Sequence, residues 1–181
     1  SQRPDYSGAA IAFWHNEAQL DSVIIRNNIF SNAQRTTYFI EDPTGVNGKI
    51  IDHNTIYNGS PGDTVYWNYG VAMFEGSQFS LYTSNTNFDA FSAYADPLFV
   101  DAGNLDFTLY ANSPCIDAGA DIGATYDFSG NPVPNGMLPD IGAMEYEALG
   151  LKEDESIDWL IYPNPTSGIL TIYNSSATFG M

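Results

Sequence analysis

Basic side chains are scarce in this sequence, and their scarcity limits the reactions that it could catalyse. Removing the proton α to the carboxylate of a uronic acid needs a base, usually Lys or Arg, and a cation that neutralises the carboxylate. The 181 residues include five Lys and Arg. Four of them precede residue 95: Arg3, Arg26, Arg35 and Lys49. We therefore assign no catalytic residue and expect this chain not to cleave pectate or alginate.

Four other positions are candidates for binding an acidic sugar: Arg26, Asp52, His53 and Trp14. Arg26 and Asp52 occupy equivalent places in two similar segments, so they are expected to be neighbours on the outer surface. The structural alternative is an Arg–carboxylate pair worth about 0.2–1 kcal/mol. His53 corresponds to Asn27 and can equally be a polar corner residue. Trp14 could stack on a sugar ring, but such an aromatic residue can also be part of the packing.

Three carboxylates form a candidate calcium site: Asp117, Asp121 and Asp127. Ca²⁺ takes six to eight oxygen ligands that converge from separate loops. The sequence has neither the spacing of an EF-hand nor a calcium-binding nonapeptide repeat. An Asp before Gly or Ala also caps turns without a metal, which is the structural alternative. No Cys or His cluster indicates zinc, so calcium is the one cofactor considered.

Composition excludes several classes of partner. The net charge is −17, which argues against nucleic acid, because phosphate binding depends on cations that release counterions. A 44% hydrophobic content is enough for a core. No apolar run approaches the roughly 20 residues of a membrane-spanning helix, so no transmembrane segment is expected. The lone Cys115 cannot form an internal disulfide and is predicted to be a small buried side chain.

An internal repeat predicts the architecture that carries these residues. Segments 23–32 and 49–58 align without gaps at an offset of 26 residues. Such a period indicates a solenoid in which each repeat buries its apolar face on the next. Asn suits sharp corners between strands, and stacked turns would place Asn28 on Asn54, about 4.8 Å apart. We expect an all-β fold whose residues 1–95 are the final turns of a right-handed parallel β-helix.

Less regular segments complete the predicted turns. Further strands are expected at 8–13, 37–40, 70–74 and 79–82, and turn-rich loops at 41–48 and 59–66. A leucine-rich repeat is the competing solenoid, but its repeating Leu positions and helical segments are absent. No convincing helical periodicity is present.

An ordered series of motifs follows residue 95. It comprises Asp96-Pro97-Leu98-Phe99, Asp106-Phe107-Thr108-Leu109, Ser113-Pro114-Cys115-Ile116-Asp117-Ala118-Gly119, Asp127-Phe128-Ser129-Gly130-Asn131-Pro132 and Asp140-Ile141-Gly142-Ala143-Met144-Glu145. The series resembles the module that follows parallel β-helices of the pectate-lyase-like superfamily in bacterial surface proteins. This resemblance implies a secreted β-helix protein. We expect 96–147 to cap the open end of the coil, using Leu98, Phe99, Phe107, Leu109, Ile116, Ile122, Phe128, Ile141 and Met144.

The end of the chain resembles a secretion signal. Residues 148–158 are acidic and read as a solvated linker. The stretch Leu160-Ile161-Tyr162-Pro163-Asn164-Pro165-Thr166-Ser167-Gly168-Ile169-Leu170-Thr171-Ile172 resembles the start of the C-terminal sorting domain of type IX secretion. The resemblance implies that 159–181 is a truncated sorting domain, read by the type IX secretion machinery, and a location outside the cell or on its outer surface. An ordinary hairpin with a Pro-rich turn is the alternative.

These features together suggest an internal piece of a longer secreted protein. The parent is expected to bind or degrade extracellular acidic polysaccharide in the manner of a polysaccharide lyase, with this piece acting mainly as structural cap and secretion tail. The alternative is a non-catalytic surface adhesin or carbohydrate-binding protein. The superfamily contains lyases, hydrolases and adhesins, so the resemblance leaves the activity open.

Overall fold

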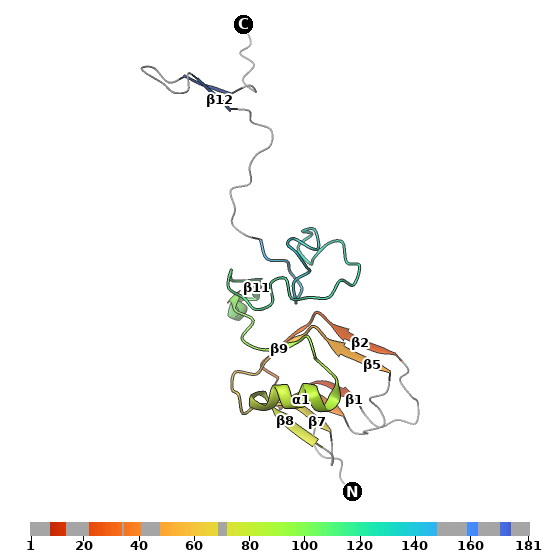
Figure 1. Ribbon diagram of the computed structural model, residues 1–181. Helices are drawn as coiled ribbons and strands as arrows, with labels where there is room; N and C mark the ends of the chain where they lie inside the picture. Colours follow the sequence, from red (N-terminus) through yellow and green to blue (C-terminus); the bar gives the residue numbers. More distant parts are fainter. Residues whose placement is uncertain are drawn as a thin grey trace. The chain divides into compact units, whose positions relative to one another are not determined.

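Strands form most of the regular structure in the computed structural model, which confirms the all-β class (Figure 1). The structure describes residues 8–13, 22–33, 35–40, 48–68 and 72–147, together with the backbone of strands 159–162 and 171–174. The chain divides into two compact units, 1–147 and 148–181. No described helix has the length and apolar character needed to cross a membrane.

The largest sheet contains four strands in the order β1-β4-β7-β8. They are β1 (Ala9–Phe13), β4 (Thr36–Ile40), β7 (Thr64–Asn68) and β8 (Ala72–Glu75). The first three are parallel, with Tyr38 between Ile11 and Tyr66 in register. Because β4 has a strand on either side, all five of its residues are buried. The strands predicted at 8–13 and 37–40 are thus confirmed.

Two further sheets confirm the register predicted from the repeat. In one, β2 (Val23–Arg26) pairs in parallel with β5 (Lys49–Asp52), which places Ile25 against Ile51. In the other, β3 (Ile29–Ser31), β6 (Thr55–Tyr57) and β9 (Ala93–Tyr94) are parallel, with Phe30 against Ile56. Because β8 makes the largest sheet mixed, the right-handed parallel β-helix stays a prediction. Below, the strands and corners of residues 8–95 are called the coil.

The asparagine corner forms as predicted between Asn28 and Asn54. Oδ1 of Asn54 accepts hydrogen bonds from the backbone N–H (3.0 Å) and Nδ2 (3.3 Å) of Asn28. Its Nδ2 donates to the carbonyl of Ile25 (3.1 Å) and to Asp89 (3.0 Å). The preceding residues, Asn27 and His53, have φ values of 57° and 53°, a left-handed conformation that Asn and His tolerate better than most residues. At the later corner, after β6, Oδ1 of Asn58 accepts a hydrogen bond from the backbone N–H of Ala33 (3.0 Å).

The segment after β6 differs from the prediction at three points. Residues 79–82 were expected to be a strand, but they begin the helix α1 (Phe79–Thr86), after a short 3₁₀ turn, η2 (Gly76–Gln78). The run also fits a helix, since residues 79 and 82 are three apart and share a face. The strand at 70–74 runs antiparallel to β7, because a connection as short as 69–71 cannot join parallel strands. In addition, β7 begins inside the predicted loop 59–66.

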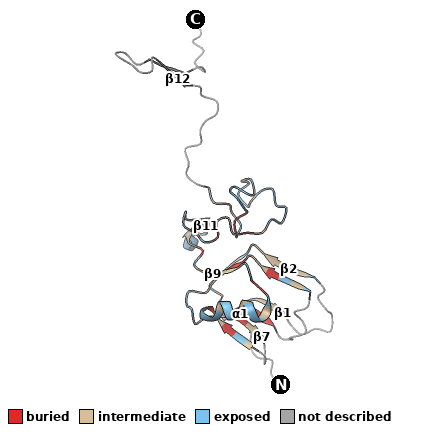
Figure 2. Cartoon of the chain, viewed as in Figure 1, coloured by how far each residue is buried: buried red, intermediate tan, exposed pale blue. Residues whose placement is uncertain are grey.

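The core of the coil is rich in aromatic side chains. Tyr38, Tyr66, Phe74, Tyr82 and Phe88 are buried together with Ile40, Ile51, Ile56 and Val65. Tyr82 is the buried residue of α1, whose other residues are exposed or half-buried, as Figure 2 shows. Its ring centroid lies 5.1 Å from that of Tyr66 and 5.7 Å from that of Phe79. Figure 1 shows α1 beside β7 and β8, so the helix supplies part of this core.

A carboxylate is buried beside this aromatic core. Asp89 is fully buried and accepts hydrogen bonds from the hydroxyl of Tyr82 (2.8 Å), Oγ of Ser92 (2.6 Å) and Nδ2 of Asn54. Burial raises the pKa of Asp89, although these hydrogen bonds oppose the shift. The pKa of Tyr82 is raised well above its usual value, mainly by burial and then by the charge of Asp89. Asp89 therefore links α1 to the asparagine corner.

Replacing Asp89 by Asn is expected to change how stability depends on pH. Because the folded pKa of Asp89 is raised above the reference value of 3.8, its contribution is complete below that value and is lost as pH rises through the folded pKa. Asn cannot ionise, so the free energy of unfolding of Asp89→Asn should increase relative to wild type between pH 4 and pH 7. Urea unfolding followed by circular dichroism measures this difference.

Asp127→Asn provides a control of opposite sign. The pKa of Asp127 is lowered, because hydrogen bonds from backbone N–H groups outweigh the effect of burial. Its contribution is present above the unfolded pKa and lost as pH falls. The free energy of unfolding of this variant should therefore fall relative to wild type as pH rises toward about 4, and should change little relative to wild type between pH 4 and pH 7. Parallel pH profiles for the two variants would contradict the burial argument for Asp89.

Residues 96–147 contain little regular structure. They include β10 (Phe99–Asp101), η3 (Ala102–Asn104) and β11 (Asp106–Leu109), the strands being antiparallel. Hydrogen bonds from backbone N–H groups to carboxylates fix much of the remaining backbone. Oδ1 of Asp117 accepts from the N–H groups of Met137 and Leu138, and the two carboxylate oxygens of Glu145 accept from those of Asn135 and Asp140.

The contacts of 96–147 with the coil include the outer side of β3 and β6. Cys115 is buried, as predicted, and its Sγ lies 3.3 Å from Oγ1 of Thr55. Ile29 packs against the cluster of Leu109, Cys115 and Ile141. Of the nine predicted covering residues, Leu109 and Ile141 are buried, whereas Ile122 (58% exposed) and Phe128 (83% exposed) are not. These last two assignments were wrong, because apolar residues in an irregular segment carry no periodicity that indicates their direction.

The second unit contains an antiparallel pair, as expected for the tail. Strand β12 (Trp159–Tyr162) pairs with β13 (Thr171–Asn174), with Ile161 against Ile172. The predicted linker 148–158 lies outside the described residues. The identity of 159–181 as part of a sorting domain stays a prediction.

Candidate functional site

Three of the four predicted sugar-binding residues lie together where β2 and β5 end. Arg26 and Asp52 are partners in the parallel register of these strands. Because Ile25 and Ile51 pack in the core, strand alternation directs Arg26 and Asp52 to the outer face. The same face carries Ile24 (63% exposed) and Ile50 (43% exposed). The fourth residue, Trp14, lies outside the described residues.

Asp52 organises the corner that follows β5. Its Oδ1 accepts hydrogen bonds from the backbone N–H groups of His53 (2.9 Å) and Phe91 (2.8 Å). Its Oδ2 lies 3.5 Å from Nδ1 of His53, and this ring nitrogen is buried without a hydrogen bond of good geometry. The carboxylate therefore fixes two turns of the coil and leaves one oxygen beside the imidazole ring.

His53 and Phe91 form a pair of stacked rings. Their centroids are 5.3 Å apart and their planes differ by 25°. Phe91 is 71% exposed, while the side chain of His53 is 23% exposed. An exposed aromatic face beside hydrogen-bonding groups offers both the apolar and the polar contacts that a pyranose ring presents. Below, Arg26, Asp52, His53 and Phe91 are called the corner site.

Arg26 does not form the expected ion pair with Asp52. Within the described part of the chain, no carboxylate lies within ion-pair distance of it, and its Nε is buried without a hydrogen-bond partner. The oxygen atoms of Asp52 are directed to His53 and Phe91 instead. Arg26 also lines a cavity of about 200 Å³ whose wall includes Tyr126 and Asp127. The same wall carries the acidic residues Asp127, Asp140 and Glu145.

The three predicted calcium ligands do not fit a metal site. Oδ1 of Asp117 is directed to the backbone of 137–138, and Oδ1 of Asp121 accepts from the N–H of Gly123. Both oxygens of Asp127 accept hydrogen bonds from Asn131, and Oδ2 also accepts from Glu145. Nowhere in the described ranges do three or more His, Cys, Asp or Glu side chains form a group able to hold a metal. These carboxylates cap turns, which was the structural alternative.

The corner site offers interactions suited to binding a sugar. Elimination from a uronic acid needs a base near the sugar and a cation on its carboxylate. Arg26 is the cation of the corner site, and Lys49 lies elsewhere, with its Nζ 5.2 Å from the ring centroid of Phe13. His53 faces Asp52 through Nδ1. Stacking, hydrogen bonding and charge attraction are therefore the interactions that these four side chains offer.

Sequence reasoning missed Phe91, the most exposed member of the corner site. It belongs to a third turn, whose Ser92 accepts a hydrogen bond from the backbone N–H of Asn54 at 2.7 Å. This turn follows the second by 38 residues, since Thr55 pairs with Ala93, and β8 and α1 occupy part of the added length. It also has Ser where the earlier turns have Asn. A search for repeats with a fixed spacing of 26 residues could not find this third turn. A search that allows gaps between repeats could find it through the segment Phe–Ser–Ala–Tyr.

Comparisons with known proteins leave the family open. The chain is 30% identical over 90 residues to an uncharacterized protein, YwoF, of Bacillus subtilis (strain 168). The match covers 50% of this chain and 19% of YwoF, so this chain spans about a fifth of the length of that relative. No protein-family model matches the sequence, and no solved structure matches it significantly.

Proposed function

We propose that this chain belongs to a secreted or cell-surface protein built as a right-handed parallel β-helix, and that its corner site binds extracellular acidic polysaccharide. The β-helix is supported by parallel pairing in three sheets, two of which have a step of 26 residues between the first two turns. Secretion is supported by the resemblance of 96–147 to modules of bacterial surface proteins, and by that of the tail to a type IX sorting domain, which the type IX machinery would read.

The observation that carries the binding proposal is the exposed ring of Phe91 stacked on His53. A sugar ring that covers Phe91 would bury apolar C–H groups on it. Its hydroxyls would reach Oδ2 of Asp52, which lies at the edge of the histidine ring. Arg26, on the same face, would attract the carboxylate of a uronic acid. The net charge of −17 opposes an acidic polymer at long range, so binding should be weak and should strengthen when salt screens that repulsion.

Phe91→Ala is expected to weaken binding of an oligogalacturonate about 2- to 10-fold, because an aromatic contact of this kind is worth about 0.5–1.5 kcal/mol. Isothermal titration calorimetry measures the affinity, and absorbance of unsaturated uronate reports cleavage, which should not exceed a control without protein. Arg26→Gln should weaken binding of the acidic oligomer but not of a neutral glucan.

Phe107→Ala is the matched control, since it shortens another exposed phenylalanine (42% exposed) that lies outside the corner site. Its affinity for the oligogalacturonate should equal that of wild type. Equal losses for Phe91→Ala and Phe107→Ala would exclude the corner site as the binding surface. Appearance of unsaturated product would show instead that this chain contains a lyase active site.

A further inference from the structure

Asparagine followed by glycine is a dipeptide prone to spontaneous chemical change, because glycine has no side chain to shield its backbone nitrogen from the preceding amide. The sequence contains three such pairs, at 47–48, 58–59 and 135–136. Asn47 lies outside the described residues. The other two asparagines are described, and the surroundings of their side-chain amides differ.

The side-chain amide of Asn58 is held at both of its polar atoms. Its Oδ1 accepts a hydrogen bond from the backbone N–H of Ala33 (3.0 Å). Its Nδ2 donates to Oγ1 of Thr37 and to the carbonyl of Thr64, both at 3.4 Å. The residue is half-buried. To bring Cγ onto the nitrogen of Gly59, the side chain would have to leave all three partners.

The side chain of Asn135 is exposed and less restrained. Within the described residues it makes one hydrogen bond, from Nδ2 to the carbonyl of Tyr146 (3.2 Å). Its backbone is fixed instead, since its N–H donates to Oε2 of Glu145 (2.8 Å). Among the backbone hydrogen bonds of the described residues, none is donated by Gly136. Gly136 is also exposed, so solvent can remove the proton from its N–H.

Packing requires a glycine at position 136. An added Cβ there would collide with Oδ1 of Asp117. The same oxygen accepts hydrogen bonds from the N–H groups of Met137 (2.7 Å) and Leu138 (2.9 Å). A larger residue, which would slow an attack by its own nitrogen, therefore does not fit. The contact that shapes this turn also preserves the reactive pair.

We propose that Asn135 is a site of spontaneous deamidation in the folded protein. The nitrogen of Gly136 loses its proton and attacks Cγ of Asn135. The new C–N bond closes a succinimide ring, and Nδ2 leaves as ammonia with the proton that was lost. Water then opens the ring. Cleavage between the nitrogen and Cγ gives aspartate, whereas cleavage between the nitrogen and the main-chain carbonyl carbon gives isoaspartate.

Isoaspartate alters the backbone between two anchors of the turn. Its main chain runs through the former side chain and so contains an additional methylene between positions 135 and 136. Before this point the N–H of Asn135 is bound to Glu145, and after it two N–H groups are bound to Asp117. The lengthened chain should therefore lose the bonds to Asp117. Aspartate leaves the backbone unchanged but places an acceptor oxygen against the carbonyl of Tyr146.

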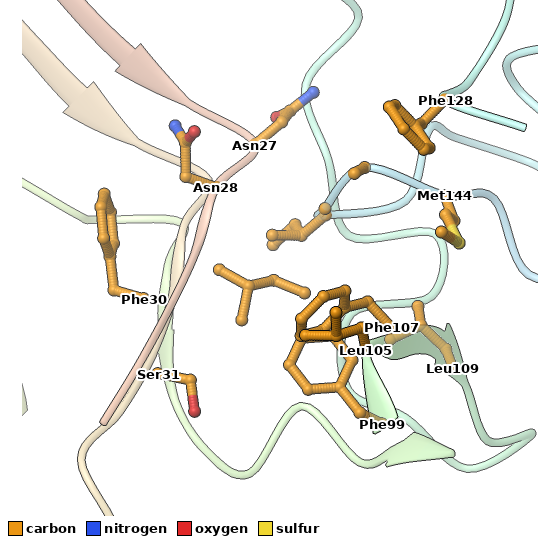
Figure 3. A pocket seen from close by; sticks show the side chains of 14 residues that line it. Asn27, Asn28, Phe30, Ser31, Phe99, Leu105, Phe107, Leu109, Phe128 and Met144 are labelled. Atoms are coloured by element: carbon orange, nitrogen blue, oxygen red, sulfur yellow. The ribbon is translucent and has the colours of Figure 1, made fainter. Parts of the chain in front are cut away.

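The anchors of this turn lie beside a wall of the largest cavity among the described residues, which has a volume of about 750 Å³. Figure 3 shows Met144 on this wall and Asn28 of the coil across the cavity. The wall has its own bond to the coil, from the N–H of Gly142 to the carbonyl of Asn27 (3.1 Å). The change at Asn135 should therefore stay local to the turn.

The test incubates the full 181-residue chain at mildly alkaline pH and maps its peptides by mass spectrometry. Asn135 should be converted about tenfold or more faster than Asn58, since Asn58 must give up two more hydrogen bonds. In heavy-oxygen water the product should carry the label, because solvent opens the ring. Asn135→Gln, whose amide lies one methylene farther from the backbone, should remain unconverted. In guanidinium chloride the two rates should converge.

Hydrogen exchange on the separated isoaspartate form tests the effect on the turn. The amides of Met137 and Leu138 should lose protection, and that of Gly142 should keep it. Asn135→Asp supplies the charge without lengthening the chain, so it should leave Met137 and Leu138 protected.

Conversion of Asn58 as fast as that of Asn135 in the folded chain, or no conversion of Asn135, would overturn the proposal. Unchanged exchange at Met137 and Leu138 in the isoaspartate form would refute the anchoring role of Asp117. Loss of protection at Gly142 as well would show that the change extends beyond the turn, contrary to the local effect expected.

Discussion

Replacing Asn54 by Ala is expected to lower the free energy of unfolding by about 3 kcal/mol, because several buried polar groups lose their partners at once. The side chain of Asn54 is fully buried and makes hydrogen bonds to Asn28, Ile25 and Asp89. Its loss leaves the Ile25 carbonyl and part of the Asp89 carboxylate unsatisfied in the interior. Urea unfolding monitored by circular dichroism measures the change.

Asn28→Ala is the matched control, because Asn28 occupies the same position one turn earlier and is exposed. Its Nδ2 donates to the carbonyl of Arg26 (2.7 Å) and to Asn54, and water can replace both contacts. A loss of about 1 kcal/mol or less is expected. Equal losses for the two variants would mean that the corner is stabilised by backbone conformation and not by the buried amide.

Tyr82→Ala should destabilise the coil by about 3–5 kcal/mol, the range for removing a large buried aromatic side chain. The ring lies within 6.1 Å, centroid to centroid, of Tyr66, Phe74 and Phe79. The replacement leaves a cavity among these rings and removes the hydroxyl that donates to Asp89. Differential scanning calorimetry should show a corresponding fall in Tm.

Two variants separate the parts of this effect. Tyr82→Phe keeps the ring and removes the hydrogen bond to Asp89, so we expect a loss of about 1–2 kcal/mol. Leu81→Ala changes the neighbouring residue of α1, which is 52% exposed, and should change stability by about 0.5 kcal/mol or less. If Leu81→Ala lowered stability as much as Tyr82→Ala, α1 would pack on the core through a different face.

The register of the first two turns could be predicted from sequence because the same pattern of residues occurs in both turns. Ile25 and Ile51, like Phe30 and Ile56, are equivalent residues at one offset, and a one-residue slip would turn both apolar sets outward. The same reasoning placed Arg26 beside Asp52 but predicted the wrong interaction. Residue type gives proximity along a sheet, whereas ion pairing depends on rotamers and on which backbone donors compete for the carboxylate.

The helix and the third turn could not be predicted in this way. Phe79, Leu81 and Tyr82 satisfy both an alternating and a helical pattern over four residues, and the buried Asp89 that accepts from Tyr82 lies seven residues later. Nothing local shows that a carboxylate will be buried, since its partners Asn54 and Ser92 come from two turns. The exposure of apolar residues in 96–147 could not be predicted for a similar reason. Loops fixed by hydrogen bonds to carboxylates have no periodic pattern of buried and exposed residues.

The unequal lengths of the turns have a consequence for how such a coil can change. Thirty-eight residues separate Asn54 from Ser92, against 26 between Asn28 and Asn54, yet the parallel pairing β3-β6-β9 continues across both steps. The corner therefore tolerates insertions in the chain between its repeats. The requirement is that the next strand is preceded by a small polar residue that can accept a hydrogen bond from the corner before it. Exposed stretches of the connections, such as residues 59–62, are consequently natural places for acquiring or exchanging surface features, whereas 76–87 is not, because Tyr82 belongs to the core.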